Sequence, residues 1–462
     1  MRLPIPLVVL GAFGSELLQF VISPLRFSIF LITRKSWKKK VREALAAPTP
    51  TPDPGAWAGT FKPPTGDRQP HLLISCGETS GELHASNFLD SLRALCEESD
   101  DAVKPHVSGL GGQILRDHDV EVRYPLAEHA VFGLKGVFQS LPFLGKALAT
   151  YVRILRDDRP DVVVLFDYPG LHLVFARAAR RLGIPVLHVV APQHWAWGPW
   201  RTRRYRKVVD VCLAILPFEP AWFEQSGMRS AYIGHPLLDE VAEATDEQTT
   251  EVSDGDTRPV LGLLPGSRRV EVEIHLGPML QIAKDLQGES GPLRVQIPHR
   301  NPKRARQIRE ALAKRQDEGL DQDLDIELLE GDPGSVLSRA RVVLAKSGTG
   351  SLEAALHNTP TVVCYRFVDI FGRFVINQIV MAPWFGIANL CMNREISPEI
   401  AVLEPADWAK VLGAVRGFWN DGPSRDTALE DLRLLHERLG SPGASDRTAR
   451  WLLPFCRRGG RS

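Results

Sequence analysis

Residues Pro259–His275 read PVLGLLPGSRRVEVEIH, and this stretch decides the fold of the chain's second half. An apolar run ends in the turn Pro265-Gly266-Ser267, and a helix-like segment follows an arginine pair. A buried strand that leads through a Gly-Ser turn into a helix presents backbone N–H groups to an anion in open α/β sheets. Arg268 at this turn can clamp a phosphate or diphosphate. The pattern also suits an ordinary strand–turn–helix connection with a surface arginine, so a second signal is needed.

That second signal lies roughly 80 residues further on. Arg341–Ala345 is typical of a short buried strand, and the turn Ser347-Gly348-Thr349 follows it before a helix that starts near Ser351. Small residues let the backbone approach a ligand closely, and the positive end of the helix dipole points to the same place. Glu353, one turn into the helix, is placed to accept hydrogen bonds from a ribose diol. Two such turns in one half predict a nucleotide-sugar site.

Composition limits the class of protein. The chain has 462 residues, enough for two or three domains, and 44% of them are hydrophobic. The net charge is +1, from 56 basic and 55 acidic residues, which argues against a dedicated nucleic-acid binder. Six cysteines are scattered without a CxxC pair, which indicates a reducing compartment and neither disulfides nor zinc. We therefore expect no metal and no cofactor.

The first 45 residues differ from the globular body. Ile5–Ile32 carries only two charged residues, Glu16 and Arg26, and is long enough to cross a hydrocarbon core. A basic cluster, Arg34–Arg42, follows at once and favours retention at an anionic cytoplasmic lipid surface. A single span, a membrane hairpin and an interfacial helix all remain open. A cleaved signal peptide is disfavoured, because the positive charge follows the apolar segment instead of preceding it.

From His71 onward, strand-like and helix-like segments alternate. Asp161–Phe166 is a run of β-branched residues typical of a central parallel strand. Asp167 follows directly, at the carboxyl end where open α/β sheets place functional residues. The second half repeats this alternation, which predicts two Rossmann-like, doubly wound domains facing a cleft. The predicted divisions are a membrane-associating segment (1–45), a Pro-rich linker (46–70), an acceptor domain (71–240), a linker (241–258), a nucleotide-sugar domain (259–420) and C-terminal helices (421–462) that pack on the first domain or on a partner subunit.

A collinear series of motifs extends over roughly Leu72–Leu453 and leaves the N-terminal segment and linker outside it. Its members are Gly77-Glu78-Thr79-Ser80-Gly81, Phe132-Gly133, Asp167-Tyr168-Pro169, Trp195-Ala196-Trp197, Leu216-Pro217-Phe218-Glu219, Ile233-Gly234-His235-Pro236, Leu264-Pro265-Gly266-Ser267-Arg268 with Glu271 and Glu273, Ser347-Gly348-Thr349 with Leu352-Glu353, and Tyr365-Arg366. In its order and composition this series resembles one known family, the lipid-A-disaccharide synthases, which are glycosyltransferases of the two-domain GT-B architecture.

Three departures from the family pattern fall on the acceptor side. Gly170-Leu171-His172 stands where the family usually has Asp or Gly followed by Phe-Asn, and Glu82 stands where it has Asp. Gly198-Pro199-Trp200 intervenes before Arg201, where the family usually continues directly with a basic or polar residue. These changes leave the donor site intact and put the acyl-chain and acceptor preference in question.

The resemblance implies an inverting transfer from UDP-2,3-diacylglucosamine to the 6-hydroxyl of 2,3-diacylglucosamine 1-phosphate. Such a transfer needs a base at the acceptor hydroxyl and positive charge at the departing diphosphate. Asp167 is the candidate base, with helix capping as its structural alternative, and Arg268 is the candidate leaving-group stabiliser. The remaining candidate substrate-binding residues are Gly266, Ser267, Ser347, Gly348, Thr349, Glu353, Asn389, Arg394, Glu78, Ser80 and Gly81.

The implied partners are a UDP-sugar donor, a lipid acceptor and the membrane surface, with no nucleic acid and a possible homodimer. The implied location is the cytoplasmic face of the inner membrane of a double-membrane bacterium. Three alternatives stay open: a GT-B transferase with another lipid-linked acceptor, an isomerase of the UDP-N-acetylglucosamine 2-epimerase type, and a non-catalytic membrane scaffold. The presence of both Asp167 and Arg268 argues against the scaffold.

Overall fold

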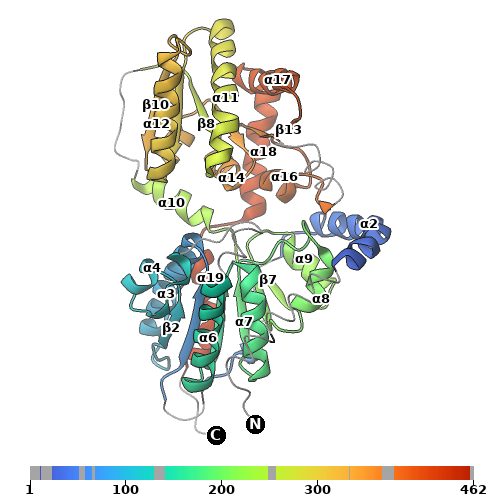
Figure 1. The fold of residues 1–462 in the computed structure, drawn as a ribbon, viewed down its shortest axis with the longest axis vertical. Helices are drawn as coiled ribbons and strands as arrows, with labels where there is room; N and C mark the ends of the chain where they lie inside the picture. The colour runs from blue at the N-terminus through green and yellow to red at the C-terminus, as the bar shows by residue number, and fades with distance from the viewer. Residues whose placement is uncertain are drawn as a thin grey trace. The chain divides into compact units, whose positions relative to one another are not determined.

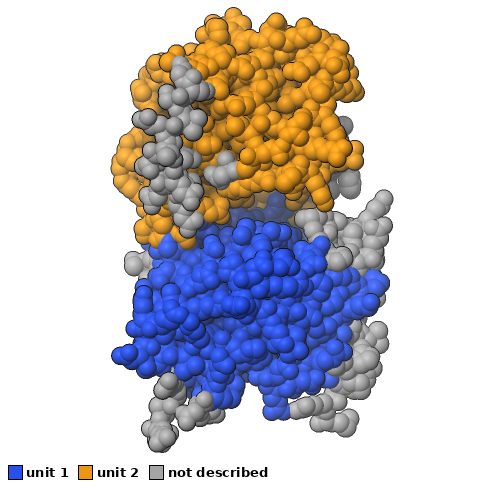
Figure 2. Space-filling model, turned by 90° about the vertical axis from the view of Figure 1, so that its left-hand side faces the viewer, with its two compact units in different colours: residues 1–236, 443–462 blue, residues 237–442 orange. Residues whose placement is uncertain are grey.

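The computed structural model describes residues 11, 23–50, 58–64, 68–128, 141–247, 256–331, 333–366 and 379–457. The chain divides into two compact units (Figure 2): unit 1 combines residues 1–236 with 443–462, and unit 2 is residues 237–442. Each unit contains one parallel β-sheet with helices packed against it (Figure 1). The prediction of two doubly wound α/β units is confirmed.

Among the described residues, the sheet of unit 1 has seven parallel strands in the order β3-β2-β1-β4-β5-β6-β7. The chain moves outward from β1 to β3 and then returns to β4 beside β1, where Cys76 pairs with Phe166. This reversal makes the carboxyl ends of β1 and β4 the topological switch point, where open α/β sheets bind ligands. The strands are β1 (His71–Cys76), β2 (His106–Leu110), β3 (Glu121–Tyr124), β4 (Val162–Phe166), β5 (Val186–Val189), β6 (Val211–Ala214) and β7 (Ser230–Tyr232).

Helices cover both faces of this sheet, so its central strands are buried from end to end. On one face, Phe88 and Leu92 join Trp451 and Phe455 in the core beneath β1 and β4. On the other, Tyr151 stacks on Phe175 with ring centroids 4.1 Å apart. The α-helices are α2 (Ser23–Leu45), α3 (Thr79–Glu98), α4 (Gln113–Asp117), α6 (Leu141–Asp157), α7 (Pro169–Arg181), α8 (Thr202–Tyr205), α9 (Glu219–Glu224) and α19 (Ala444–Cys456).

The described sheet of unit 2 has six parallel strands in the order β10-β9-β8-β11-β12-β13. Its switch point lies between β8 and β11, where Ala345 pairs with Leu264. The strands are β8 (Val260–Leu264), β9 (Arg294–His299), β10 (Asp325–Glu330), β11 (Val342–Lys346), β12 (Thr361–Arg366) and β13 (Glu399–Val402). The α-helices are α10 (Leu237–Glu247), α11 (Arg269–Ser290), α12 (Pro302–Asp317), α13 (Gly334–Leu337), α14 (Thr349–Leu356), α16 (Ile387–Met392), α17 (Trp408–Trp419) and α18 (Pro423–Leu439).

The chain passes from unit 1 to unit 2 after Pro236 and returns to unit 1 after Pro442. Helix α10, which sequence analysis divided between the acceptor domain and the linker, groups with unit 2. The C-terminal region separates into α18, which groups with unit 2, and α19, which packs on α3 in unit 1. The chain therefore enters unit 2 once and returns from it to complete unit 1.

Near the N-terminus, α2 runs without a break from Ser23 to Leu45 and carries both the end of the apolar stretch and the basic cluster. The basic flank therefore continues the same helix as the end of the apolar stretch. Buried side chains of α2, including Phe30, Val41 and Leu45, attach it to the rest of unit 1. Across the described residues, no helix combines the length and apolar character that a bilayer span requires. Residues 1–10 and 12–22 lie outside the described part of the chain.

Candidate functional site

The two Gly-rich turns of unit 2 lie next to each other at the β8/β11 switch point. One follows Leu264 and the other follows Lys346, at the carboxyl ends of paired strands. A Cβ atom on Gly350 would lie 3.3 Å from Leu264 Cδ1, so the second turn packs closely on the end of β8. Each turn leads directly into a helix, α11 and α14 respectively. The structure thus brings together the two predicted donor-binding segments.

A carboxylate of the chain itself occupies the anion position at the first turn. The backbone N–H groups of Ser267 and Arg268 donate to Glu271 Oε2 over 3.1 and 3.2 Å. Gly266 has φ +126°, and a side chain there would collide with Glu271. The Lys346 ammonium lies 2.9 Å from Glu271 Oε1. This turn therefore already holds a negative group with two N–H donors and a cation, the arrangement that a phosphate requires.

Electrostatics favour the charged form of Glu271. Burial raises its pKa, but the hydrogen bond and charge of Lys346, with the Arg268 N–H and guanidinium, outweigh burial and lower the pKa overall. Arg268 lies 3.6 Å from the same carboxylate, and its side chain is 70% exposed. The sequence indicated Glu271 only as a member of a family motif and gave no role to Lys346. Their contact joins the first turn of α11 to the end of β11, 75 positions further along the chain, which no local pattern reveals.

The second turn positions its predicted residues by backbone contacts. The Ser347 N–H donates to Cys364 O over 3.1 Å, and the Ser351 hydroxyl donates to Gly348 O over 2.7 Å at the start of α14. Glu353 is 6% exposed and accepts a hydrogen bond from Arg300 Nη2 over 2.8 Å. Arg300 is a second residue that sequence reasoning missed. A ribose that bonds to Glu353 would share this carboxylate with a guanidinium.

Asn389 lies in α16, which packs against α14, and Arg394 follows that helix. The Asn389 amide donates to Ser397 O and Glu399 Oε1 and accepts from two backbone N–H groups, all within 2.7–2.9 Å. It is fully buried, so its amide closes the loop that follows α16. Arg394 lies 2.6 Å from Asp431. These contacts give both residues structural partners within the unit.

In unit 1, Asp167 stands at the β1/β4 switch point. Asp167 and Tyr168 both have left-handed backbones, with φ of 50° and 48°, a conformation that costs about 1–2 kcal/mol for each non-glycine residue. The Tyr168 ring lies over Gly77, where a Cβ atom would overlap it. Burial raises the pKa of Asp167, and a hydrogen bond from the Tyr168 N–H opposes that rise. The strained turn thus carries a partly buried carboxyl at the carboxyl ends of β1 and β4, where sheets of this type bind ligands.

The neighbouring Gly-rich turn of unit 1 leads into α3. Glu78 precedes the helix, Ser80 is exposed in its first turn, and Gly81 packs against the carbonyl of Phe166 at the end of β4. Glu82 is buried, and its Oε1 accepts hydrogen bonds from the N–H groups of Gly112 and Leu115 at the start of α4. Glu82 is one of the departures from the family pattern. It therefore fixes the turn that leads into α4, beside the Gly-rich turn that leads into α3.

Four histidines of unit 1 are kept neutral by burial, which lowers the pKa of His188 to about 4 and those of His172, His194 and His235 to about 3. In the unfolded chain they titrate near 6.5. Below that pH the unfolded state binds protons that the folded state refuses. The free energy of unfolding therefore falls as pH drops from about 6.5 toward 4, by up to ~1.4 kcal/mol per pH unit for each histidine.

We expect unit 1 to open locally more often in mild acid than at neutral pH. Hydrogen exchange measured peptide by peptide at pH 7 and pH 5, corrected for the intrinsic exchange rate, should show lost protection in β4 and β5. His172→Asn removes one of these titrating groups and should make the loss smaller. Equal protection of these strands at the two pH values would contradict the expectation.

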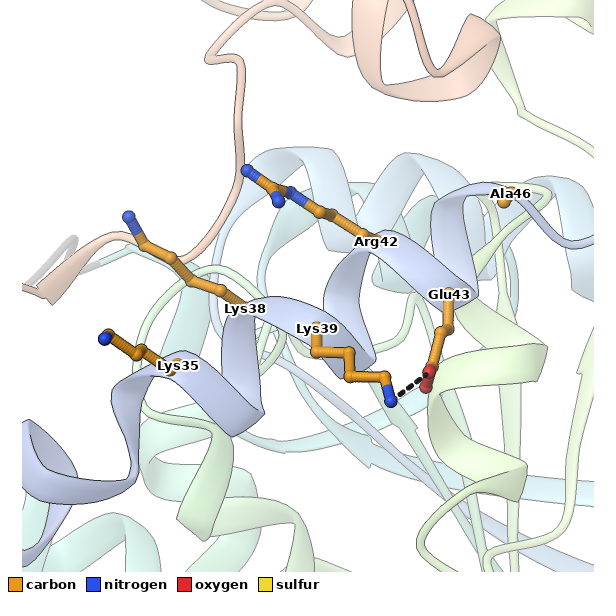
Figure 3. A pocket seen from close by; sticks show the side chains of 6 residues that line it. All are labelled: Lys35, Lys38, Lys39, Arg42, Glu43 and Ala46. Carbon is orange, nitrogen blue, oxygen red and sulfur yellow. Dashed lines mark ion pairs between the residues drawn. The ribbon is translucent and has the colours of Figure 1, made fainter.

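Basic side chains gather along one stretch of α2 (Figure 3). An open hollow there is lined by Lys35, Lys38, Lys39, Arg42, Glu43 and Ala46. Lys39 lies 3.8 Å from Glu43, the single carboxylate among these lining residues. Burial, followed by repulsion from Arg34 and Arg42, lowers the pKa of Lys38. The charged form of Lys38 is therefore disfavoured, first by burial and then by its basic neighbours.

The other exposed part of α2 is apolar. Ile29, Leu31 and Ile32 are 52, 43 and 84% exposed, just before the basic residues. Inward-facing aromatic side chains attach the helix to unit 1: Phe30 lies 4.9 Å from Trp200, and Trp37 lies 6.1 Å from Trp222, between ring centroids. Trp200 belongs to the segment in which this sequence departs from the family pattern. The N-terminal helix and that segment thus pack on each other.

Two parallel α/β units, each with Gly-rich turns at its switch point, form the two-domain GT-B architecture. Solved structures of that type resemble the chain at the level of the fold: the S. aureus MnaA–UDP complex has a TM-score of 0.54 at 16% identity and covers 82% of this chain and 94% of its own. Acinetobacter baumannii MurG has a TM-score of 0.50 at 16% identity and covers 82% of this chain and 98% of its own.

Sequence comparisons narrow the class further. The sequence model described as lipid-A-disaccharide synthetase matches residues 72–411, so the chain belongs to that family of glycosyltransferases in lipid A biosynthesis. The lipid-A-disaccharide synthase of Azotobacter vinelandii is 32% identical and covers 71% of this chain and 84% of its own length. That of Myxococcus xanthus is 31% identical, over 83% and 97%. The matched range includes every predicted site residue; of the family motifs, Phe132-Gly133 lies outside the described structure.

Proposed function

We propose that the chain joins UDP-2,3-diacylglucosamine to the 6-hydroxyl of 2,3-diacylglucosamine 1-phosphate. The products are the β-1,6-linked lipid A disaccharide 1-phosphate and UDP. The observation that supports this most is the family match over residues 72–411, within which both sheets carry the motif residues at their switch points. The fold alone would suit other nucleotide-sugar reactions, and the family match is what favours this one.

Each unit contributes one part of the proposed chemistry. Asp167 accepts the proton of the acceptor 6-hydroxyl as that oxygen attacks the anomeric carbon of the donor. The bond from this carbon to the diphosphate oxygen breaks, and UDP leaves with the bonding electron pair. A raised pKa makes the buried carboxylate of Asp167 a stronger base than an exposed aspartate. No metal ion takes part in the proposed reaction.

The departing diphosphate is stabilised from unit 2. Arg268 offers a guanidinium, and the N–H groups of Ser267 and Arg268 offer dipoles, at a turn that already holds a carboxylate. Lys346 adds a second positive charge at the same place. The turn Ser347-Gly348-Thr349, which follows the neighbouring strand β11, also binds the phosphates. Glu353 binds the ribose. For the phosphates to use these donors, Glu271 has to give them up or share them.

The direct test is an assay of the purified full chain in detergent with both lipid substrates, with the disaccharide followed by mass spectrometry. We expect disaccharide 1-phosphate and UDP in equal amounts. If UDP binds but no disaccharide forms, the acceptor has been assigned wrongly, and other lipid-linked acceptors should then be assayed. The altered segments Gly170–His172 and Gly198–Arg201 are the observation that favours such an alternative. Conversion of UDP-N-acetylglucosamine to UDP-N-acetylmannosamine, with the diphosphate bond intact, would instead indicate the isomerase.

We further propose that α2 binds an anionic bilayer at the cytoplasmic face of the inner membrane. Its exposed apolar residues precede a surface with four cations and one carboxylate, the pattern of a helix that lies at a lipid interface. The substrates are diacylated, so an enzyme fixed at the bilayer meets them where they reside. A homodimer is a further prediction from the family resemblance, and light scattering of the detergent-solubilised chain tests it.

The predicted effect on lipid binding is large. Replacing Lys35, Lys38, Lys39 and Arg42 with glutamine should lower affinity for phosphatidylglycerol-containing vesicles by about 10²–10³-fold, because each cation near such a surface contributes about 1 kcal/mol. Flotation with vesicles of increasing phosphatidylglycerol content measures it. The matched control neutralises four exposed cations on α12: Lys303, Arg306, Arg309 and Lys314. Equal losses from the two helices, or strong binding to neutral vesicles by both variants, would contradict a specific role of α2.

A further inference from the structure

Two buried histidines bond to the same backbone carbonyl in unit 1. His172 Nδ1 lies 2.7 Å from the carbonyl oxygen of Asp167, and His188 Nε2 lies 2.9 Å from it. A carbonyl oxygen only accepts hydrogen bonds, so both of these ring nitrogens carry the proton. His172 lies on α7 and His188 on β5, so the carbonyl is held from two different elements.

The other ring nitrogens complete the arrangement. His172 Nε2 lies 3.0 Å from the Ser75 hydroxyl, and His188 Nδ1 lies 2.6 Å from the Tyr205 hydroxyl. Burial lowers the pKa of both imidazoles, to about 3 and about 4, so each ring is neutral at physiological pH and these nitrogens accept. The two histidines are therefore fixed as opposite tautomers, Nδ1–H in His172 and Nε2–H in His188.

This network supports the strained turn that presents the candidate base. The left-handed backbone of Asp167 and Tyr168 directs the Asp167 carbonyl into the unit, where a buried acceptor needs donors. The Asp167 N–H donates to Val189 O over 3.0 Å, and the N–H of His172 donates to Tyr168 O over 3.2 Å. With both peptide groups of the turn bonded, the direction of the Asp167 side chain is set by the backbone.

We propose that His172 and His188 are positioning residues, which hold the Asp167 peptide group so that its carboxylate meets the acceptor hydroxyl. This inference rests on the proposed function. It assigns a task to two histidines on the acceptor side, one of them at a departure from the family pattern. Neither imidazole exchanges a proton in the reaction; each contributes a fixed N–H donor behind the base.

Isosteric substitutions test the assigned donors. The Asn side-chain amide nitrogen matches His Nδ1 in distance from the backbone, and the Gln amide nitrogen matches His Nε2. We expect His172→Asn to keep kcat within about five-fold and His172→Gln to lower it by about 10–10²-fold, the cost of a misplaced reacting group. For His188 the order is reversed, with Gln retaining activity and Asn losing it. The KM for the UDP-sugar should stay unchanged throughout.

The control is His71→Gln, at a buried histidine that lies 2.8 Å from Ser108 at the opposite end of β1. It should leave kcat unchanged. Equal losses with Asn and Gln at both positions, or a larger loss with the smaller Asn at both, would overturn the positioning role. A rise in KM with constant kcat would also overturn it, because that result indicates binding.

A second measurement is independent of activity. In ¹⁵N-histidine-labelled protein, long-range ¹H–¹⁵N spectra should show His172 protonated on Nδ1 and His188 protonated on Nε2 at pH 7. The same tautomer at both positions, or a charged ring, would overturn the proposed network even if the enzyme is active. If the wild type forms no disaccharide but the tautomers are as assigned, the proposed function fails while the held carbonyl stands.

Discussion

Replacing Asp167 with asparagine is expected to lower kcat for disaccharide formation by about 10²–10⁴-fold, the usual contribution of a general base. Asparagine has nearly the same shape and tolerates the left-handed backbone found at this position, so the turn should be retained. The carboxylate that accepts the proton is lost, whereas the donor site in unit 2 is untouched. The KM for the UDP-sugar should therefore change little, and kcat and KM measured separately will show the difference.

The pH dependence of the wild type belongs to the same prediction. Burial raises the pKa of Asp167 above that of an ordinary aspartate, and the active form is the carboxylate. Activity should fall as pH drops through this raised pKa, so the acid limb should lie above pH ~4, where an exposed aspartate titrates. The asparagine variant should lack this limb. Because buried histidines also destabilise unit 1 in acid, each sample should regain full activity when returned to pH 7.5 before a limb is assigned.

A different result would reassign the base. If the asparagine variant keeps kcat within about three-fold, Asp167 is a structural residue that shapes the turn. The acid limb would then belong to another group at this edge, and Glu78, the residue before α3, would be the first to replace.

Arg268→Ala is expected to lower kcat by about 10²–10³-fold, the usual cost of removing one donor that stabilises developing charge. Lysine should restore only part of this, because an ammonium cannot form two parallel bonds to a diphosphate. The neighbouring Arg269 is a matched control: its side chain is similarly exposed and lies 2.8 Å from Glu273, with which it forms an ion pair. Arg269→Ala should leave kcat within about two-fold.

Inhibition by UDP separates the alternatives at this arginine. Arg268→Ala should raise the UDP inhibition constant if the guanidinium holds the diphosphate in product as well as in the transition state. Loss of kcat without weaker UDP binding would mean that the arginine acts only on the charge that develops in the transition state. Equal effects of the Arg268 and Arg269 variants would show that the turn needs positive charge in general, and would contradict the assigned clamp.

Sequence patterns predicted the interior of both sheets better than their edges. The buried runs Asp161–Phe166 and Val260–Leu264 were recognised because strands covered on both faces are continuously apolar. The edge strands β3, β7 and β13 were not predicted. They are three or four residues long and include partly exposed positions, so they lack both the length and the apolar run that identify a central strand.

The candidate site divides in a similar way. Its turns were predictable because glycine and serine mark places where the backbone bends or a ligand comes close. Glu271 with Lys346, and Glu353 with Arg300, were not predictable, because each pair joins a helix to the end of a strand far away in the sequence. The substitution at His172 was noted as a departure, but only the structure shows that it supplies a donor to Asp167. Asn389 was expected near the donor, and the structure shows its amide engaged in a loop.

The return of the chain from unit 2 to unit 1 has a consequence for biosynthesis. Trp451 and Phe455 of α19 complete the core that Phe88 and Leu92 begin. At ~5–20 residues per second, a ribosome needs roughly 10–40 s to make the intervening residues 237–442, during which this core lacks its last helix. The nascent first unit therefore exposes apolar surface to chaperones and proteases while the second unit can fold without interruption. A premature stop near Gly440 would leave unit 2 whole and unit 1 permanently open.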